Sequence, residues 1–352
     1  MKIALITDLH FGVRNDHSAF ADHQEKFFEQ VFFPYLKENQ IDTIVDLGDT
    51  FDRRKYINFV SLDRAKRMFF DPIDKNQYKF HVLVGNHDSF YKNTLEINSI
   101  NLLAEHYDIH IYDHPQVTTF DGLKIVMLPW ICSGNEEEVK SLCTSTDAQV
   151  LFGHLELSGY QMYKGQAIHH GMSDDWLRKF DVVCTGHYHT KSTSGNINYL
   201  GCPYEMTWSD FDDQKGFHVF DTDTRELTFI PNPYRIFYKI HYDDSNKNME
   251  QVVNENFEQL AGSYVKVIIT EKNNPYWFDI FIEKLEKSNP IHVQVVEDHL
   301  HLDIESDDEI VSEAEDTLTI LGKYINGLES NVDKISLEKT IKDLYQEALS
   351  IT

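Results

Sequence analysis

Short apolar runs, each followed by polar residues, recur along the first two thirds of the chain. Five of these runs are rich in Val, Ile, Leu and Phe, and they cover residues 3–6, 43–47, 80–84, 150–152 and 182–184. Runs of this length predict buried strands of a sheet that is covered on both faces. Apolar residues recur at helical spacing over 21–38 and 59–69, between the first three strands. This order of strands and helices predicts an α/β fold with right-handed crossovers and a mostly parallel sheet.

A polar cluster directly follows each of the five runs. The clusters are Asp8-Leu9-His10, Gly48-Asp49-Thr50-Phe51-Asp52, Gly85-Asn86-His87-Asp88, Gly153-His154 and Gly186-His187-Tyr188-His189. Because open α/β sheets bind ligands beyond the carboxyl ends of their strands, we expect the five clusters to converge. The glycine in four of them is typical of a strand that ends in a tight turn, where a residue without Cβ fits best.

The residue types in these clusters indicate a site for two metal ions. Imidazole, carboxylate and carboxamide groups without a thiolate suit Mn²⁺, Fe²⁺ or Zn²⁺, whereas carboxylates alone would indicate Mg²⁺ or Ca²⁺. We expect Mn²⁺, with Mg²⁺, Fe²⁺ or Zn²⁺ as alternatives. A shared carboxylate can hold two ions roughly 3.5–4 Å apart, and Asp49 is the candidate bridge. A lone His on a loop is more often an ordinary surface residue, but five clusters in order favour the metal site.

The ordered motifs resemble those of the calcineurin-like metallophosphoesterases over residues 1 to about 230. The resemblance implies a β-sandwich flanked by helices. It implies that one metal is held by Asp8, His10, Asp49 and His189. It implies that the other metal is held by Asp49, Asn86, His154 and His187. His87 would then be the catalytic residue that is not a ligand and that protonates or stabilises the leaving oxygen.

Two carboxylates are candidates for orienting His87. A His that stays oriented and partly protonated needs a carboxylate nearby, and Asp52 and Asp88 are the nearest in sequence. For both, the alternative is a structural role. Asp52 opens a helix-like segment and Asp88 follows a turn, and Asp often makes local hydrogen bonds at such positions.

Within that superfamily, the chain most resembles the SbcD-type DNA repair nucleases, and especially their tailed-phage form. The residues that carry this resemblance are Gly48 to Lys55, Leu128-Pro129-Trp130 and Gly201-Cys202-Pro203-Tyr204. The basic residues Arg53, Arg54 and Lys55 are the predicted DNA contacts. Cellular members commonly have a His where Asp52 stands, and that His is tied to exonuclease action. The balance of exonuclease and endonuclease activity is therefore open.

The resemblance implies a nuclease with 3′→5′ exonuclease action on duplex ends and endonuclease action on single strands. Such a nuclease works with an SbcC-type ATPase in double-strand-break processing, recombination and repair. One alternative is a small-molecule or protein phosphoesterase, although Gly-Asn-His-Glu would be more typical of protein phosphatases than the Gly-Asn-His-Asp present here. Another alternative is an inactive scaffold, but such proteins usually lose several ligands and none is missing.

The pattern changes after the proline-marked junction at 229–233. Strands are predicted over 236–242, 264–270 and 292–296, and helices over 249–260 and 277–287. We therefore divide the chain into a nuclease domain (1–233) and an α+β domain (234–305), which resembles the capping domain that helps select DNA ends. The alternative is a plain appended domain. An acidic linker (306–316) and two amphipathic helices (317–352) follow.

The two terminal helices cannot bury their apolar faces alone. The resemblance implies that they bind the coiled-coil base of an SbcC-type ATPase, in a heterotetramer built on a homodimer of this chain. The competing explanation is that they dock on this chain's own domains. His169 and His170 have no assigned role, and we interpret them as loop residues.

The net charge of −26 is opposite to that of a free-standing DNA binder. The acidity is uneven, because residues 297–316 contain ten Asp or Glu and no Lys or Arg, whereas basic residues follow the second motif at 53–55 and 64–67. A solvated helix face is the alternative for 64–67. Cys132, Cys143, Cys184 and Cys202 form no metal or disulfide pattern, which suits a reducing cytoplasm. We expect no membrane span and no signal peptide.

Overall fold

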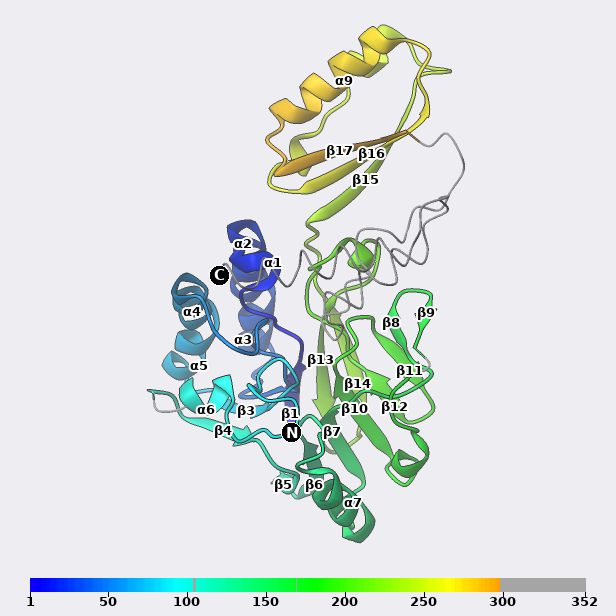
Figure 1. The fold of residues 1–352 in the computed structure, drawn as a ribbon. Coiled ribbons are helices and arrows are strands. Elements are labelled where there is room, and N and C mark those ends of the chain that lie inside the picture. The colour runs from blue at the N-terminus through cyan, green and yellow to red at the C-terminus, as the bar shows by residue number, and fades with distance from the viewer. Residues whose placement is uncertain (104–105, 169, 298–352) are drawn as a thin grey trace, which may run out of the picture. The chain divides into compact units, whose positions relative to one another are not determined.

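The computed structural model describes residues 1–103, 106–168 and 170–297. Two six-stranded sheets form the N-terminal sandwich (Figure 1). The first sheet has the order β14 (Leu227–Pro231), β13 (Gly216–Asp221), β1 (Lys2–Ile6), β2 (Thr43–Asp46), β3 (Lys79–Leu83) and β4 (Ile109–Tyr112). The second has the order β11 (Ser192–Ser194), β12 (Ile197–Tyr199), β10 (Val182–Gly186), β7 (Val150–His154), β6 (Leu123–Leu128) and β5 (Gln116–Phe120).

Parallel pairing dominates the centre of each sheet. Strands β1 to β4 are parallel, as are β12, β10, β7 and β6, while β13, β14, β5 and β11 pair antiparallel. This confirms the predicted α/β sandwich. The expectation that all five apolar runs share one sheet is wrong, because β7 and β10 lie in the second sheet. Local sequence cannot distinguish these cases, since strand pairing depends on distant partners.

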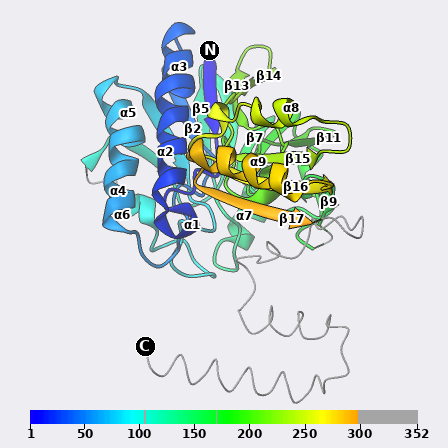
Figure 2. The ribbon, with the colours of Figure 1, turned by 90° about the horizontal axis from the view of Figure 1, so that it is seen from above.

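Two long helical stretches cover the outer face of the first sheet (Figures 1 and 2). The first consists of α2 (Ser18–Phe27), a π-helical turn (Phe28–Phe32) and α3 (Phe33–Glu38). The second consists of α4 (Phe59–Ala65), a π-helical turn (Lys66–Phe70) and α5 (Asp71–Lys75). Both were predicted, although the second is longer than expected. Each π turn ends two residues before a proline, Pro34 or Pro72, which has no N–H to donate to the preceding turn of the helix.

The remaining elements of the sandwich are short. They are α1 (Val13–Asp16), α6 (Ser99–Leu103), α7 (Glu136–Ser145), β8 (Gln161–Tyr163), β9 (Gln166–Ala167) and the 3-10 turns Asp175–Leu177 and Trp208–Asp210. In the described part of the chain, none of the helices combines the length and the hydropathy that a membrane span requires. The four cysteines are free, as their spacing predicted, and all four are buried.

Apolar side chains fill three layers of the sandwich. The layer between the helices and the first sheet is rich in Phe, including Phe27, Phe28, Phe32, Phe69 and Phe80. Strand β1 contributes Ala4 and Ile6 to this layer, and Ile3 and Leu5 to the layer between the two sheets. A third cluster lies on the outer face of the second sheet under α7. Because the central strands are buried on both faces, they show continuous apolar runs and not alternation.

A three-stranded parallel sheet forms the C-terminal α+β region. It comprises β15 (Phe237–Asp243), β16 (Tyr264–Glu271) and β17 (His292–Glu297), with α8 (Met249–Val253) and α9 (Pro275–Lys287) packed on one face (Figure 1). The helix predicted over 249–260 is wrong in length, because it ends at Val253 and a 3-10 turn follows at Glu258–Leu260. The Asn256 side chain accepts a hydrogen bond from the Glu258 amide, which favours a turn over a continuing helix.

Several predictions lie outside the described residues. They concern His169, the end of the capping domain after 297, the acidic linker at 306–316 and the helical pair at 317–352. The domain boundaries stay predictions.

Candidate metal centre

The strands of both sheets bring the five polar clusters together. Asp8 and His10 follow β1, Asp49 follows β2, and Asn86 and His87 follow β3. The second sheet contributes His154 at the end of β7, with His187 and His189 just after β10. The carboxyl ends of two sheets, and not of one, therefore build the site.

One group of donors consists of Asp8, His10 and His189, whose ligand atoms lie within 4.8 Å of one another. The Nε2 atoms of His10 and His189 are 3.1 Å apart. The Asp8 Oδ1 atom lies 3.9 Å from each of them. Two imidazole nitrogens and a buried carboxylate that face one point form a donor set suited to a divalent transition metal.

A second group consists of Asp49, His154 and His187. The His154 Nε2 atom lies 3.3 Å from Asp49 Oδ2. The Asn86 Oδ1 atom lies 3.0 Å from both His154 Nε2 and His187 Nδ1, so it adds a fourth donor. Asp49 Oδ2 is also 3.9 Å from His10 Nε2. The Asp49 carboxylate therefore lies between the two groups, which is the position that a shared ligand requires. Together the two groups form a donor set that fits two divalent cations.

A further group, His189, Cys202 and Asp210, has a different explanation. Asp210 forms a buried ion pair of 2.7 Å with Lys215. The Cys202 thiol donates to the carbonyl of Tyr204. These contacts satisfy the residues within the protein, so the group needs no ion.

Contacts behind the donors fix their orientation. The Leu47 carbonyl lies 2.8 Å from His154 Nδ1, which leaves Nε2 facing the site. Asp8 accepts hydrogen bonds from the Thr7 hydroxyl at 2.7 Å and from the His187 amide. The Asp52 Oδ1 atom lies 3.5 Å from His10 Nδ1. A carboxylate or carbonyl on the far nitrogen is the usual way to fix the tautomer of a metal-binding His.

The backbone at the site is strained. Asp8, His10, Asp49 and His187 all have positive φ, between 44° and 89°, although none is glycine. Such conformations cost about 1–3 kcal/mol each and persist where the surroundings determine them, often at functional sites. Glycine is required nearby, since a Cβ on Gly85 would lie 2.1 Å from Asp49 Oδ1, and a Cβ on Gly186 would lie 2.0 Å from Thr7 Oγ1.

The carboxylates make the site favourable for positive charge. Burial opposes protonation of His10, but Asp52, Asp49 and Asp8 outweigh it and raise the pKa of His10 to about 10. Burial likewise opposes protonation of His154, and Asp49 raises the pKa of that imidazole to about 9. Burial also opposes ionisation of Asp49, but His154 and His87 hold its pKa well below the usual value. A cation is thus favoured between these groups.

His87 forms a third group with His10 and Asp49, whose ligand atoms also lie within 4.8 Å of one another. Its ring centroid is 4.8 Å from that of His10, and its amide donates to Asp49 Oδ1. Its Nδ1 atom lies 2.6 Å from the backbone carbonyl of Asp52, so the partner of the ring at this atom is a carbonyl and not the carboxylate that we expected. Because Nδ1 is engaged in this way, Nε2 is the nitrogen suited to exchange a proton with a substrate.

The two candidate partners have different roles from those expected. The Asp88 carboxylate accepts hydrogen bonds from the amides of Asp49, Thr50 and Gly85, which favours its structural alternative. The Asp52 carboxylate contacts His10, with Oδ1 3.5 Å from His10 Nδ1. Asp52 does not cap a helix, because α4 begins at Phe59 and is capped by the Asn58 side chain, so of its structural alternatives only that of a turn residue is left.

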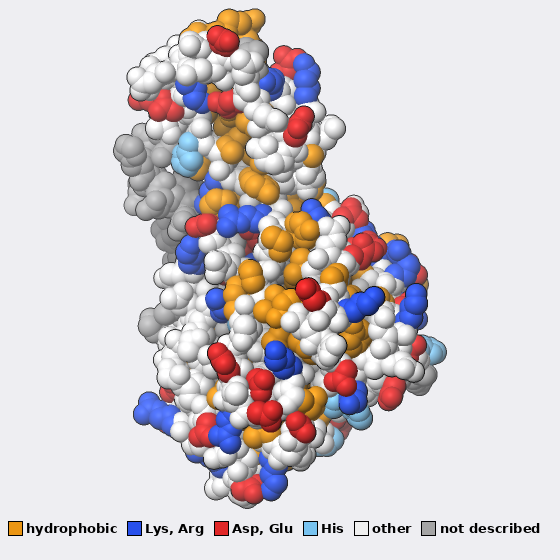
Figure 3. All heavy atoms as spheres, turned by 180° about the vertical axis from the view of Figure 1, so that it is seen from behind, with side chains coloured by type: hydrophobic (Ala, Val, Ile, Leu, Met, Phe, Trp, Pro, Cys, Tyr) orange, Lys and Arg blue, Asp and Glu red, His pale blue; other side chains and the backbone are white. Residues whose placement is uncertain are grey.

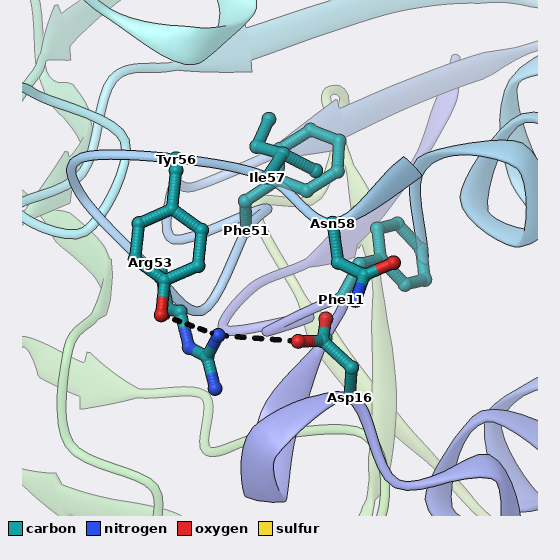
Figure 4. A pocket seen from close by; sticks show the side chains of 8 residues that line it. Phe11, Asp16, Phe51, Arg53, Tyr56, Ile57 and Asn58 are labelled. Carbon is teal, nitrogen blue, oxygen red and sulfur yellow. Dashed lines mark hydrogen bonds and ion pairs between the residues drawn. The ribbon is translucent and has the colours of Figure 1, made fainter. Parts of the chain in front are cut away.

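The predicted DNA-binding cluster is partly engaged within the protein. Arg53 pairs with Asp16 at 3.1 Å and donates to the Tyr56 hydroxyl at 2.7 Å, at a small pocket beside Phe11 and Phe51 (Figure 4). Arg54 donates to the Ser89 carbonyl at 3.0 Å, and Lys55 is exposed. Arg64 contacts Asp22 and Glu25 of α2, so this residue is engaged within the protein and is not on a solvated helix face. On the face in Figure 3, basic and acidic side chains are interspersed.

Sequence reasoning missed Lys215. Its ammonium is buried and donates to the His189 carbonyl at 2.8 Å while it pairs with Asp210 and Asp213. Lys215 thereby links the loop that carries His189 to the segment before β13. No local motif marks this Lys. Trp130, whose only signal in the sequence is the Leu-Pro-Trp motif, packs against His187 with ring centroids 5.0 Å apart.

Comparison with known proteins identifies the class. The chain matches the calcineurin-like phosphoesterase family over residues 1–191 and belongs to that family. It is 34% identical to exonuclease subunit 1 of Enterobacteria phage T4 over 99% of both chains. It is also 24% identical to the SbcD subunit of the nuclease SbcCD of Staphylococcus epidermidis, over 80% of this chain and 79% of that protein. These relatives confirm the resemblance found in the motifs.

One solved structure that matches is the calcineurin-like phosphoesterase YfkN from Bacillus subtilis. Its TM-score is 0.36 and its identity 12%, over 66% of this chain and 88% of that one.

Proposed function

We propose that this protein is a metal-dependent nuclease that cleaves phosphodiester bonds of DNA. The observation that carries the proposal is the extent of the similarity to exonuclease subunit 1, which covers 99% of both chains and not only the family domain at 1–191. A phosphoesterase of unrelated substrate would share the metal motifs without sharing the C-terminal third. The donor geometry supports the chemistry that this substrate needs.

The assignment of roles follows the two donor groups. One cation would be held by Asp8, His10, Asp49 and His189, and the other by Asp49, Asn86, His154 and His187. Two such ions, most suitably Mn²⁺, would supply a nucleophilic hydroxide and neutralise the charge on the phosphate oxygens. The side chains of the protein position the phosphate for in-line attack and deliver a proton. His87 Nε2 is the proposed proton donor to the leaving oxygen, since its Nδ1 atom is occupied by the Asp52 carbonyl.

Exonuclease and endonuclease action are both proposed, on duplex ends and on single strands. The proposed partners are DNA and an SbcC-type ATPase, because one relative is named as a subunit of SbcCD. In this proposal the chain forms a homodimer within a heterotetramer and acts in the cytoplasm, in recombination and repair. The same proposal includes a capping role for the α+β region and binding of the ATPase by residues 317–352. It also includes phosphate contacts by Lys55 and its neighbours Arg53 and Arg54.

The test uses the full chain purified with Mn²⁺. End-labelled duplex DNA, circular single-stranded DNA and bis-p-nitrophenyl phosphate are each incubated with the protein, with EDTA as the control. We expect metal-dependent shortening from 3′ ends, cutting of the circle and hydrolysis of the small diester. Hydrolysis of the small diester without cleavage of either DNA would favour a small-molecule phosphoesterase instead. No hydrolysis of any substrate, with metals bound, would favour the inactive scaffold.

A further inference from the structure

A hollow of about 360 Å³ lies at one edge of the sandwich, where the outermost strands of the two sheets come together. Strands β13 and β14 of the first sheet and β11 and β12 of the second line it, together with Lys191 directly before β11. None of the lining residues is a donor of the metal centre. The volume lies within the range of sites that bind small molecules, about 300–1,000 Å³. We call this hollow the edge pocket.

The lining of the edge pocket contains one positive charge and no negative one. It includes Lys191 and no Asp or Glu, although acidic residues outnumber basic ones by 58 to 32 in the whole chain. The Lys191 Nζ atom lies 3.9 Å from the ring centroid of Phe229, and no acidic residue in the described part of the chain forms an ion pair with it. An aromatic ring attracts an ammonium group without neutralising it. The edge pocket therefore keeps a positive charge that an anion can balance.

Two polar atoms of the lining have no hydrogen-bond partner among the described residues. They are His218 Nδ1 and Ser192 Oγ, and His218 is only 4% exposed. Unpaired buried polar atoms are uncommon in folded proteins, and each of them calls for an explanation. Thr193 and Asn198 show the usual case, since the Thr193 hydroxyl donates to Asn198 Oδ1 and the Asn198 amide donates to the Val183 carbonyl. His218 and Ser192 are therefore the lining groups with hydrogen-bonding capacity left for a ligand.

His218 adds a neutral donor to this positive site. Burial, together with the charge of Lys191, lowers the pKa of His218 to about 3. The neutral imidazole ring has one N–H donor and one acceptor nitrogen. Its ring centroid lies 5.1 Å from that of Phe229, the same ring that Lys191 contacts. An ammonium and an imidazole around one ring, with a hydroxyl beside them, are donors of the kind that bind phosphate oxygens.

Strand β14 provides an apolar wall. Leu227 and Phe229 are alternate residues of this strand, so their side chains point to the same face of the sheet. Strand register places Phe229 opposite His218 and Leu227 opposite Phe220. Phe220 belongs to the apolar layer between the two sheets, and Leu227 packs against that layer. A phosphate ion alone would leave this wall uncovered, whereas a phosphate ester with an organic group would cover it.

We propose that the edge pocket binds a nucleoside monophosphate, with the phosphate on Lys191 and Ser192 and the nucleoside against Leu227 and Phe229. The proposal goes beyond the nuclease function above but takes the identity of the ligand from it, because mononucleotides are what an exonuclease releases. The competing role is structural, in which Lys191 only covers Phe229 and His218 only fills the layer between the sheets.

The test measures binding of 5′-dTMP, thymidine and inorganic phosphate to the full chain by titration calorimetry. EDTA is present throughout, so that no metal ion holds a phosphate at the metal centre. The variants are Lys191→Gln, which removes the cation, and His218→Leu, which removes the imidazole from the opposite sheet. Lys26→Gln is the matched control, because the Lys26 Nζ atom also lies 3.9 Å from an aromatic ring, that of Tyr234, but outside the edge pocket. Melting temperatures are measured in parallel.

We expect the wild type and Lys26→Gln to bind dTMP equally well. Lys191→Gln should bind it about 10–100-fold more weakly, which is the usual effect of losing a charge-assisted hydrogen bond. Inorganic phosphate should bind more weakly than dTMP, and thymidine should not bind measurably. His218→Leu should also weaken binding but should not lower the melting temperature, because the Nδ1 atom that it removes has no partner.

Unchanged affinity for dTMP in Lys191→Gln, or an equal loss in Lys26→Gln, would overturn the proposal. Equal affinities for dTMP and inorganic phosphate would also overturn it, since the apolar wall would then contact no ligand. A lower melting temperature in His218→Leu with unchanged affinity would establish the structural role instead. Binding of dTMP by a wild type that cleaves no DNA would leave the edge pocket in place and overturn the nuclease function.

Discussion

The metal centre and the edge pocket hold charge in opposite ways. At the metal centre the carboxylate donors and His154 are buried, with Asp8 and His154 at 0% exposure and Asp49 at 2%, and four of the donors have a left-handed backbone. In the edge pocket Lys191 is half-buried against an aromatic ring and has no acidic partner among the described residues. Buried charges need fixed partners, whereas half-exposed ones keep water and exchange partners readily. The first arrangement suits chemistry at fixed atoms, and the second suits a ligand that binds and leaves.

Asp49→Ala should have the largest effect, because it tests whether the centre is one unit. The Asp49 carboxylate lies between the two donor groups, 3.3 Å from His154 Nε2 and 3.9 Å from His10 Nε2. We expect the variant to lose both metals and all measurable hydrolysis, as determined by elemental analysis of protein purified with Mn²⁺. Asp49→Asn, which keeps one oxygen donor, should retain part of the metal. Two ions per chain in Asp49→Ala would refute the shared ligand.

His87→Ala should leave both metals bound and lower turnover on DNA by about 10²–10⁴-fold, the usual contribution of a general acid. The leaving group offers a sharper measurement. Because p-nitrophenolate departs without protonation, hydrolysis of bis-p-nitrophenyl phosphate should fall much less than DNA cleavage. Equal losses on both substrates would show that His87 stabilises the phosphate instead, and loss of metal would make it a ligand.

A variant at Asp52 tests whether metal binding also depends on a residue that contacts a ligand from behind. Its Oδ1 atom lies 3.5 Å from His10 Nδ1. Asp52→Asn should weaken metal binding about 10–100-fold, as loss of a partner behind a ligating His usually does, without changing DNA affinity in EDTA. Asp88→Asn is a useful contrast, because Asp88 accepts four backbone hydrogen bonds, so stability should fall as well. Unchanged metal affinity in Asp52→Asn would leave that carboxylate without a role at His10.

The two regions also differ in what the sequence reveals. Each ligand of the metal centre stands next to its own strand, so the convergence of Asp8, Asn86 and His154 could be predicted from five local patterns. The division of those strands between two sheets could not, since pairing is decided by distant residues. The contact of His87 Nδ1 with the Asp52 carbonyl could not be predicted, because no residue type encodes a backbone carbonyl.

The edge pocket illustrates the opposite limit. Its residues share no motif, and Lys191, His218 and Phe229 meet only because the outermost strands of two sheets lie at one edge of the sandwich. Lys215 is similar, because its three partners come together only in the folded chain. Pockets and buried networks of this kind require coordinates.

The smallest effect on diester hydrolysis is expected from a variant inside the α+β region. Phe281 is 1% exposed and packs with Tyr242 and Phe257 in a core of its own, separate from the layers of the sandwich. Phe281→Ala should destabilise this core by about 3–5 kcal/mol, enough to unfold it at moderate temperature. Since the metal donors and the edge pocket all belong to the sandwich, hydrolysis of bis-p-nitrophenyl phosphate and binding of dTMP should both persist. Calorimetry should then resolve two unfolding transitions. Only the transition at the lower temperature should shift when Phe281→Ala is compared with the milder control variant Phe281→Leu. A parallel loss of hydrolysis or of dTMP binding would mean that the α+β region supports that site, and the two sites could no longer be compared as parts of one sandwich.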